Sequence, residues 1–195
     1  FGSFGTADGS FDRAYEVAVG PDDHVWVTDL NRERVTEFGA GAHALVRAWG
    51  SYGDGGPQFQ SPSGVATDGG GNVYVADTGN DRIQRFDALG AFLGAFGQTG
   101  INFGDFKQPR GVAPAPDSTV YVADTGNHRI QRFSAIGDSP SSFGMRGTGP
   151  GQLERPFALA VTPAGLGPEP LIYVADTYNH RIQRFSRGGD FQLQW

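Results

Sequence analysis

The sequence contains no cysteine, and this absence excludes disulfide bonds, thiolate metal sites and thiol nucleophiles. It has no long apolar run, so it predicts no membrane-spanning segment. Basic residues are also few: 15 lysines and arginines stand against 21 acidic residues, for a net charge of −6. Because nucleic-acid phosphates bind basic surfaces, RNA or DNA is an unfavourable partner unless a local arginine cluster forms.

Catalytic signatures are missing as well. The chain has no G-x-S-x-G turn, no H-E-x-x-H helix and no phosphate-binding P-loop, and no motif singles out one pair of its carboxylates. His24 and His43 match no metal-ligand spacing. The sequence therefore predicts no cofactor and favours a protein without enzymatic activity.

The beginning of the chain gives little information about its compartment. It starts at Phe1, and no basic segment followed by an apolar one marks a signal peptide. We expect either a leader that has been removed or a piece of a longer protein.

Turn-forming residues are abundant. The chain has 31 glycines and 12 prolines, while 38% of its residues are hydrophobic. That composition supports a folded core interrupted by many tight turns, which is typical of many short strands.

An internal repeat is the main signal in this sequence. Three near-identical copies, with the pattern YVADTxNxRIQRF, occupy Tyr74–Phe86, Tyr121–Phe133 and Tyr173–Phe185, and a diverged copy occupies Val25–Phe38. The matching aspartates recur 48, 47 and 52 residues apart, and a Gly/Pro-rich insert at Pro163–Pro170 accounts for the longest spacing.

Each repeat divides into four strand-like pieces. In the second copy, the short, small-sided piece Gly64–Asp68 suits an innermost strand, and Val73–Asp77, Arg82–Phe86 and Phe92–Phe96 follow it after turns. Turns are expected at Gly69–Asn72, Thr78–Asp81 and Ala88–Ala91. Four strands per repeat predict an all-β propeller more than a β-solenoid or a sandwich.

The segment Pro62–Gly97, PSGVATDGGGNVYVADTGNDRIQRFDALGAFLGAFG, resembles the NHL repeat. The resemblance covers nearly the whole chain and implies one propeller domain, residues 1–195, with four four-stranded blades near residues 12–49, 59–96, 106–143 and 153–195. NHL propellers commonly have six blades, so the chain forms either a closed four-blade ring or part of a larger propeller. The resemblance, together with the missing initial methionine, favours an extracellular or cell-envelope location.

The segments between repeats align with one another and suggest how the chain is divided. They lie at Phe1–Phe11, Trp49–Phe59, Phe96–Phe106 and Phe143–Leu153. The chain therefore holds a whole number of blades, with no strand left to close a ring by exchange between its ends. Exposed blade flanks would be apolar, so we favour a fragment or a self-associating assembly over a closed ring.

Each repeat carries an aspartate and an arginine at a fixed spacing. The pairs are Asp29/Arg34, Asp77/Arg82, Asp124/Arg129 and Asp176/Arg181. A ring of acids could bind cations, but a turn that needs an acceptor, held by an arginine, explains one pair per blade better. We therefore interpret these pairs as structural.

The turn after each aspartate contains further repeated positions. Gly79 and Gly126 are expected to adopt a left-handed conformation, and Tyr178 replaces this glycine in the last copy. His128 and His180 share one repeat position, so they point along separate blades. We interpret them as exposed turn residues, with a metal site as the alternative.

The positions that vary within an otherwise constant repeat are the candidate ligand contacts. They begin each innermost strand and should ring one mouth of the central channel: Tyr15, Ser63, Arg110 and Phe157. The loops before them add Arg13, Lys107 and Arg155. Aromatic, hydroxyl and cationic side chains together suit a ligand site. Residues at the rim that are under no functional selection would explain the same mixture equally well.

These observations lead to one main functional hypothesis and several alternatives. The main hypothesis is a non-catalytic binding or scaffold module that presents loops to a protein or glycan partner. The resemblance also allows a hydrolase or lyase with a metal in the channel, and an RNA-binding domain. Self-association through exposed blade flanks is the last alternative.

Overall fold

The computed structural model describes residues 2–5, 7–163, 165, 167 and 169–195, so Phe1 and part of the Pro163–Pro170 insert lie outside the described residues.

Four antiparallel sheets make up the fold. Blade 1 contains β1 (Ala14–Val19), β2 (Val25–Asp29), β3 (Arg34–Phe38) and β4 (Leu45–Trp49). Blade 2 contains β5 (Pro62–Thr67), β6 (Val73–Asp77), β7 (Arg82–Phe86) and β8 (Phe92–Phe96). Blade 3 contains β9 (Pro109–Pro114), β10 (Thr119–Asp124), β11 (Arg129–Ser134) and β12 (Ser141–Phe143). Blade 4 contains β13 (Ala158–Val161), β14 (Ile172–Asp176), β15 (Arg181–Phe185) and β16 (Phe191–Gln194).

Within each sheet the strands follow chain order, so every blade is a simple meander. This arrangement confirms the predicted strands Val73–Asp77, Arg82–Phe86 and Phe92–Phe96, whereas the innermost strand of that blade begins earlier than expected, at Pro62. No helix in the described part of the chain is both long and apolar enough to cross a membrane.

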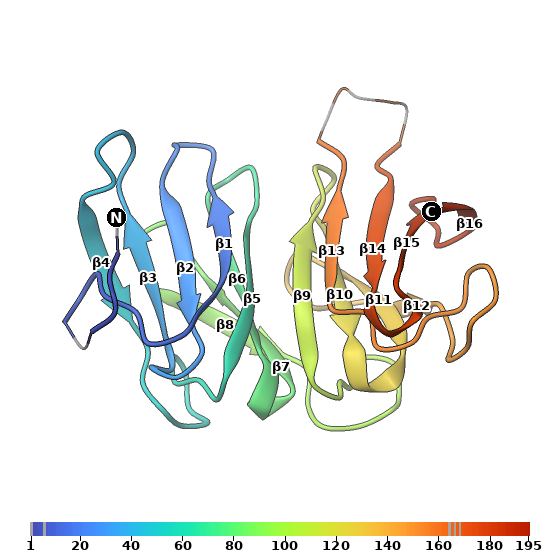
Figure 1. Cartoon of the computed structure of the whole chain (residues 1–195), viewed down its shortest axis with the longest axis horizontal. Helices are drawn as coiled ribbons and strands as arrows, with labels where there is room; N and C mark the ends of the chain where they lie inside the picture. Colours follow the sequence, from blue (N-terminus) through green and yellow to red (C-terminus); the bar gives the residue numbers. More distant parts are fainter. Residues whose placement is uncertain (1, 6, 164, 166, 168) are drawn as a thin grey trace.

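The first strands of the four blades lie next to one another along the middle of the molecule, and β4 and β16 lie at its two sides (Figure 1). At this inner position the backbones approach closely. A Cβ on Gly64 would lie only 2.1 Å from the carbonyl oxygen of Arg110, and one on Gly111 would lie 2.8 Å from that of Phe157. Glycine is required here because neighbouring strands nearly touch.

The hydrophobic cores lie between blades. The core between blades 2 and 3 joins Tyr74, Ala76 and Ile83 to Phe106 and Val112, together with other buried residues of blade 3. The cores between blades 1 and 2 and between blades 3 and 4 use equivalent positions with some different side chains, such as Trp26 and Val35 in place of Tyr74 and Ile83. Each blade thus presents one face to its predecessor and a different face to its successor.

The four blades form an open arc. Val17 and Val19 on β1 are 60% and 62% exposed, whereas Val65, which is equivalent to Val17, is 2% exposed. A closed four-blade ring would bury β1 against β13, so the arc has two free flanks.

The turn that follows the second strand of each blade differs from the prediction. Short 3-10 helices form at η1 (Thr78–Asn80), η2 (Thr125–Asn127) and η3 (Thr177–Asn179). The left-handed residue is the one after each helix, with φ of 52°, 57° and 54° at Asp81, His128 and His180, and not Gly79 or Gly126. Position 79 favours glycine for a different reason, because a Cβ there would lie 2.6 Å from the side chain of Gln60. Tyr178 keeps the same helix, and its half-exposed ring packs against Phe157.

Candidate binding site

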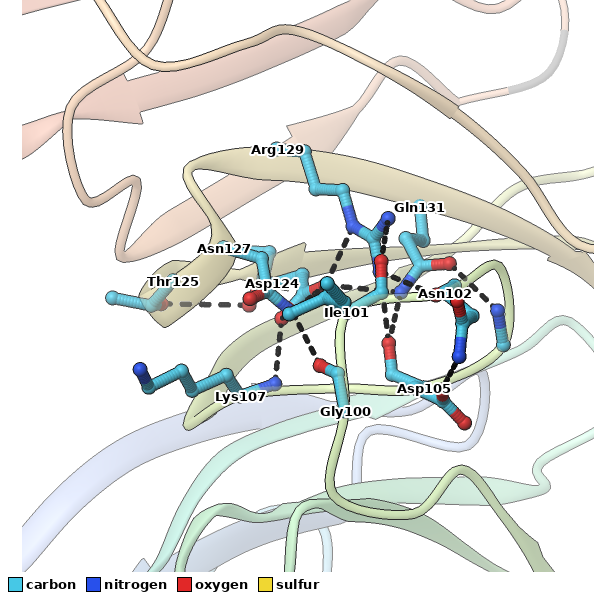
Figure 2. Close-up of polar contacts among 12 residues, drawn as sticks. Gly100, Ile101, Asn102, Asp105, Lys107, Asp124, Thr125, Asn127, Arg129 and Gln131 are labelled. Atoms are coloured by element: carbon cyan, nitrogen blue, oxygen red, sulfur yellow. Dashed lines mark hydrogen bonds and ion pairs between the residues drawn. The ribbon is translucent and has the colours of Figure 1, made fainter.

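The lead-in loop of a blade is the short segment before its first strand, and a buried aspartate fixes it. In blade 3, Asp124 accepts hydrogen bonds from the backbone N–H of Lys107 (2.8 Å), from Asn127 Nδ2 (2.9 Å) and from Gln131 Nε2 (3.0 Å). It also forms an ion pair with Arg129 Nε at 2.7 Å (Figure 2). Burial raises the pKa of Asp124, while these N–H donors act in the opposite direction.

Arginine completes the same network by donating to backbone carbonyls. Arg129 donates to Ile101, Asn102 and Asp105, whose carbonyls lie in the segment that enters the blade (Figure 2). Asp77 with Arg82, and Asp176 with Arg181, repeat the arrangement. The network ties the lead-in loop to the second and third strands, and therefore sets where the first strand begins.

Blade 1 does not follow the predicted pairing. Arg34 donates to Asp8 Oδ1 (3.0 Å) and to the backbone, and Arg32 Nε lies 3.5 Å from Asp29 Oδ2. Asp29 accepts instead from the backbone N–H groups of Asp12 and Arg13. The prediction of an Asp29/Arg34 pair is therefore wrong, because Arg32 stands at the repeat position of Asn80 and lies beside Asp29 in place of Arg34.

Successive blades are joined by a polar latch, which we define as the contact between the left-handed turn residue of one blade and the lead-in loop of the next. Glu33 Oε2 accepts the N–H of Ser61 (2.5 Å), and Asp81 Oδ1 accepts that of Gln108 (2.7 Å).

The third latch uses His128, whose Nδ1 accepts the N–H of Arg155 at 3.2 Å. Burial lowers the pKa of His128, which favours the neutral ring that this contact requires. His180 occupies the same position in blade 4 and is exposed.

The predicted ligand residues start the innermost strands, where β-bulges shift the register. The bulges fall between Ala14 and Val17 and between Pro62 and Val65, and a matching irregularity lies opposite the start of β9. Bulges are a common means of redirecting a side chain. Tyr15, Arg110 and Phe157, which directly precedes β13, lie together at one mouth of the inner face, and we name these three residues the mouth cluster.

Arg110 holds the mouth cluster together. Its Nη1 donates to the Tyr15 hydroxyl at 2.8 Å, and its guanidinium carbon lies 4.5 Å from the ring centre of Phe157 and 6.0 Å from that of Tyr15. A cation over aromatic faces is attracted to their quadrupoles. An adjoining cavity of about 350 Å³ is lined by Arg13, Tyr15, Ser61, Asp81, Gln108 and Arg110, among others.

Ser63 lines this cavity but contributes no exposed surface to it. Its hydroxyl lies 2.5 Å from that of Thr78 and donates to the carbonyl of Arg110 at 3.0 Å. Ser63 therefore joins blade 2 to blade 3 at the base of the cavity.

Two of the three further predicted cations lie at this mouth. Arg13 lines the cavity, and Arg155 lies over the ring of Tyr178 at 5.3 Å and reaches Oε1 of the lining residue Gln108 at 3.4 Å. Lys107 belongs to the lead-in loop of blade 3 and is not among the residues that line the cavity. Arg13 and Lys107 are exposed, and within the described residues their side chains form no ion pair.

Comparison with known families gives the repeat its name. The NHL repeat family matches residues 59–86, 106–133 and 168–185. Blades 2, 3 and 4 contain NHL repeats. A 35-residue part, 18% of the chain, is 60% identical to the B-box type zinc finger protein ncl-1 of Caenorhabditis elegans and covers 4% of that protein.

Solved structures show that the NHL blades belong to a β-propeller. A streptogramin B lyase matches 93% of the chain with a TM-score of 0.67 and 16% identity, and the match covers 54% of that lyase. Catalytically inactive virginiamycin B lyase from Staphylococcus aureus, solved with quinupristin, has a TM-score of 0.68 at 16% identity over 93% of the chain and 55% of the lyase. The NHL chain thus spans about half of these propellers, and the likeness concerns the fold alone.

Metal binding was the alternative for the histidines of the NHL turns. Among the described residues, no group of three or more histidine, aspartate or glutamate side chains is placed to hold a metal ion. His128 acts in a latch, and its Nδ1 also lies 3.3 Å from Glu154 Oε1.

Sequence reasoning missed the latches and the buried glutamines of the NHL repeats. Gln84, Gln131 and Gln183 are fully buried and join the aspartate to a lead-in carbonyl. Their recurrence in the three RIQRF copies was a usable signal. The latch residues vary from glutamate to histidine, so only their shared acceptor chemistry connects them.

Glu16 has an unusual environment in the first NHL blade. It occupies the position of Gly64 and Gly111, and burial raises its pKa from 4.5 to about 7. Thr28, at the position of Ala76, donates to the Ser63 carbonyl at 2.6 Å. The larger pair Glu16 and Thr28 therefore replaces glycine and alanine at the first junction.

We expect Glu16→Gln to stabilise the protein at high pH. Burial raises the pKa of Glu16 in the folded protein, so between about pH 4.5 and about pH 7 the carboxyl group ionises in the unfolded chain but stays protonated in the folded one. The free energy of unfolding of wild type therefore falls as the pH rises through this range. The variant should gain about 2 kcal/mol above pH 7, after allowance for partial solvent access, and nothing near pH 4. Urea unfolding across this range measures the difference, and an equal effect at both pH values would contradict the assignment.

Proposed function

We propose that this NHL propeller is a non-catalytic binding module that recognises an acidic segment of a protein partner at the mouth cluster. The observation that carries the proposal is the fixed position of Arg110 between Tyr15 and Phe157. The long side chain is held by its neighbours, so it loses little further freedom on binding. A planar guanidinium in such a position suits a carboxylate.

The charge distribution around the mouth supports an anionic partner. The cavity wall holds two arginines, Arg13 and Arg110, and one carboxylate, Asp81. Asp81 accepts the backbone N–H of Gln108 and the hydroxyl of Thr99, contacts that orient the carboxylate but leave its negative charge in place. The two guanidinium groups therefore give this wall a net positive charge, which favours an anion.

The opposite mouth offers fewer recognition groups. Its cavity, of about 410 Å³, is lined mainly by valine, glycine and proline, with Asp68 as its charged residue. Cations gather only at the mouth that holds Arg110, among the described cavity walls of the two mouths. This asymmetry favours one face for binding.

We expect Arg110→Gln to weaken binding of a fluorescent oligoglutamate peptide by at least about 30-fold, because a positioned guanidinium contributes about 2 kcal/mol or more. Fluorescence anisotropy at two salt concentrations measures it. Arg187→Gln is the matched control, since it removes the same charge at a 46% exposed site in the β15–β16 turn.

Equal affinities for the two variants would exclude the mouth cluster as the site. An oligolysine peptide should not bind wild type, and binding of it would contradict the proposed charge preference. Stronger binding of an acidic oligosaccharide than of oligoglutamate would assign the same site to a glycan instead of a protein partner.

A further inference from the structure

The acceptor of the third latch differs from the other two because protonation removes its ability to accept a hydrogen bond. Glu33 and Asp81 use carboxyl oxygens, and a carboxyl group keeps an acceptor oxygen whether or not it is protonated. His128 uses Nδ1 of an imidazole ring, and both ring nitrogens become donors when the ring is protonated. The joint between blades 3 and 4 therefore has a latch that a proton can open.

The Nδ1 atom of His128 lies between a donor and an acceptor. It is 3.2 Å from the backbone nitrogen of Arg155 and 3.3 Å from Glu154 Oε1. With its proton on Nε2, the neutral ring accepts the N–H of Arg155, whereas the protonated ring carries a hydrogen on Nδ1 that the carboxylate can accept. One atom cannot serve both partners at once, so protonation exchanges Arg155 for Glu154.

Charged groups on both sides of the joint set the protonation of His128. Burial lowers its pKa below the ordinary value of 6.5, and the carboxylate of Glu154 acts in the opposite direction. Three cations lower the pKa further, namely Arg146, Arg155 and Lys107. Arg146 Nε lies 3.2 Å from Glu154 Oε2 and holds the competing carboxylate in place. The ring is therefore neutral at neutral pH and gains its second proton in mildly acidic solution.

The exchange acts on one residue of the lead-in loop of blade 4. The N–H of Glu154 is held separately, because Asp176 Oδ1 accepts it at 2.7 Å. The N–H of Arg155 depends on the latch, so the loop is released at that residue. Phe157 follows in the same loop and lies 4.5 Å from the guanidinium carbon of Arg110, measured to its ring centre. Release at Arg155 therefore loosens the aromatic support of the mouth cluster.

We propose that His128 is a pH-dependent latch, which in mildly acidic solution releases the N–H of Arg155, donates to Glu154 and loosens the lead-in loop of blade 4. The exchange of partners stands on the geometry of the joint between blades 3 and 4. Its effect on ligand affinity rests on the proposed function of the mouth cluster, so the two are tested by separate measurements.

The free energy of unfolding changes in the matching direction. Because the pKa of His128 is lower in the folded protein than in the unfolded chain, the unfolded chain binds more protons below about pH 6.5, and this contribution to stability is lost as the pH falls. Glu16 contributes in the opposite direction over an overlapping range, so global unfolding would mix the two groups. The latch therefore has to be measured at the joint itself.

Nuclear magnetic resonance of the ligand-free protein between about pH 7.5 and about pH 5.5 tests the latch. The amide resonance of Arg155 should move with the same midpoint as the ring resonances of His128, because the N–H loses its acceptor. In His128→Asn it should stay fixed, since the side-chain oxygen accepts at every pH and asparagine tolerates the left-handed backbone of this turn. Glu154→Gln should shift the midpoint to lower pH, because it removes the carboxylate that favours the charged ring.

His180→Asn is the matched control, since it makes the same change at the same repeat position outside the third latch. Its Arg155 amide resonance should follow the pH as in wild type. An amide resonance that stays fixed while His128 titrates would overturn the proposal, as would an equal movement in His128→Asn.

Fluorescence anisotropy with the oligoglutamate peptide tests the effect on the mouth cluster. Between about pH 7.5 and about pH 5.5, wild type should lose about 5-fold more affinity than His128→Asn. A change in the charge of the peptide affects both proteins alike, so the comparison isolates the latch. Equal losses would overturn regulation of the mouth by the latch. An absence of binding at either pH would contradict the proposed function, and the Arg155 resonance would still decide the latch.

Discussion

Replacing Asp124 with asparagine should lower the free energy of unfolding by about 4 kcal/mol. The carboxylate is fully buried and accepts from Asn127, Arg129 and Gln131 in addition to the lead-in loop. An amide removes the charge that balances Arg129 and turns an N–H toward other donors. The guanidinium is then left with its charge largely desolvated, and such unpaired buried groups dominate the cost of this kind of substitution.

Equilibrium urea unfolding measures this loss, with Asp138→Asn as the control. Asp138 is exposed on the β11–β12 turn and makes no ion pair among the described residues, so its change should stay within about 0.5 kcal/mol. Equal midpoints for the two variants would show that the aspartate network does not hold the lead-in loop. Because Lys107 lies in that loop and Arg110 follows it, Asp124→Asn should also weaken oligoglutamate binding under native conditions.

Replacing Gly64 with alanine should destabilise the protein by about 3 kcal/mol and lower Tm by on the order of 10 °C. The new methyl carbon would lie 2.1 Å from the carbonyl oxygen of Arg110, so blades 2 and 3 must separate at the inner axis. The contact is with backbone, which cannot move aside as a flexible side chain can. Separation would also loosen the core that contains Val112.

Gly69→Ala is the matched control for the methyl group that Gly64→Ala adds. Gly69 lies in the turn after β5, its φ is not positive, and a Cβ there meets nothing within 4 Å. The substitution should be neutral or slightly stabilising, because alanine reduces the freedom of the unfolded chain. If both glycines tolerate alanine equally in thermal scans, the inner strands are not in the close contact that the structure shows.

The repeat made much of the fold predictable. Three copies of YVADTxNxRIQRF fixed the second and third strands because alternation and turn residues agree in each copy. Repeat equivalence also indicated that Tyr15, Arg110 and Phe157 would lie at one mouth, since each begins an innermost strand. Their function as a ligand site remains a proposal.

The details that the sequence did not provide depend on contacts between blades. Gly79 is constrained by its approach to Gln60, not by a positive φ, and only coordinates show that approach. Ser63 was expected to contact a ligand at the channel mouth, yet it is fully buried and its hydroxyl bonds to the backbone of the next blade. At the first junction Glu16 stands where the other inner strands have glycine, and Thr28 at the position of Ala76 bonds to the Ser63 carbonyl, a difference visible only in the coordinates.

The uniformity of the joints between blades has a consequence for how such genes change length. Every internal joint uses the same pair of faces and the same kind of latch, so a gained or lost repeat leaves the remaining joints chemically intact. Unequal recombination between near-identical copies can therefore yield a foldable product without compensating substitutions. The first junction, with Glu16 and Thr28, is the exception: a duplication there would carry a titrating carboxylate into a second joint.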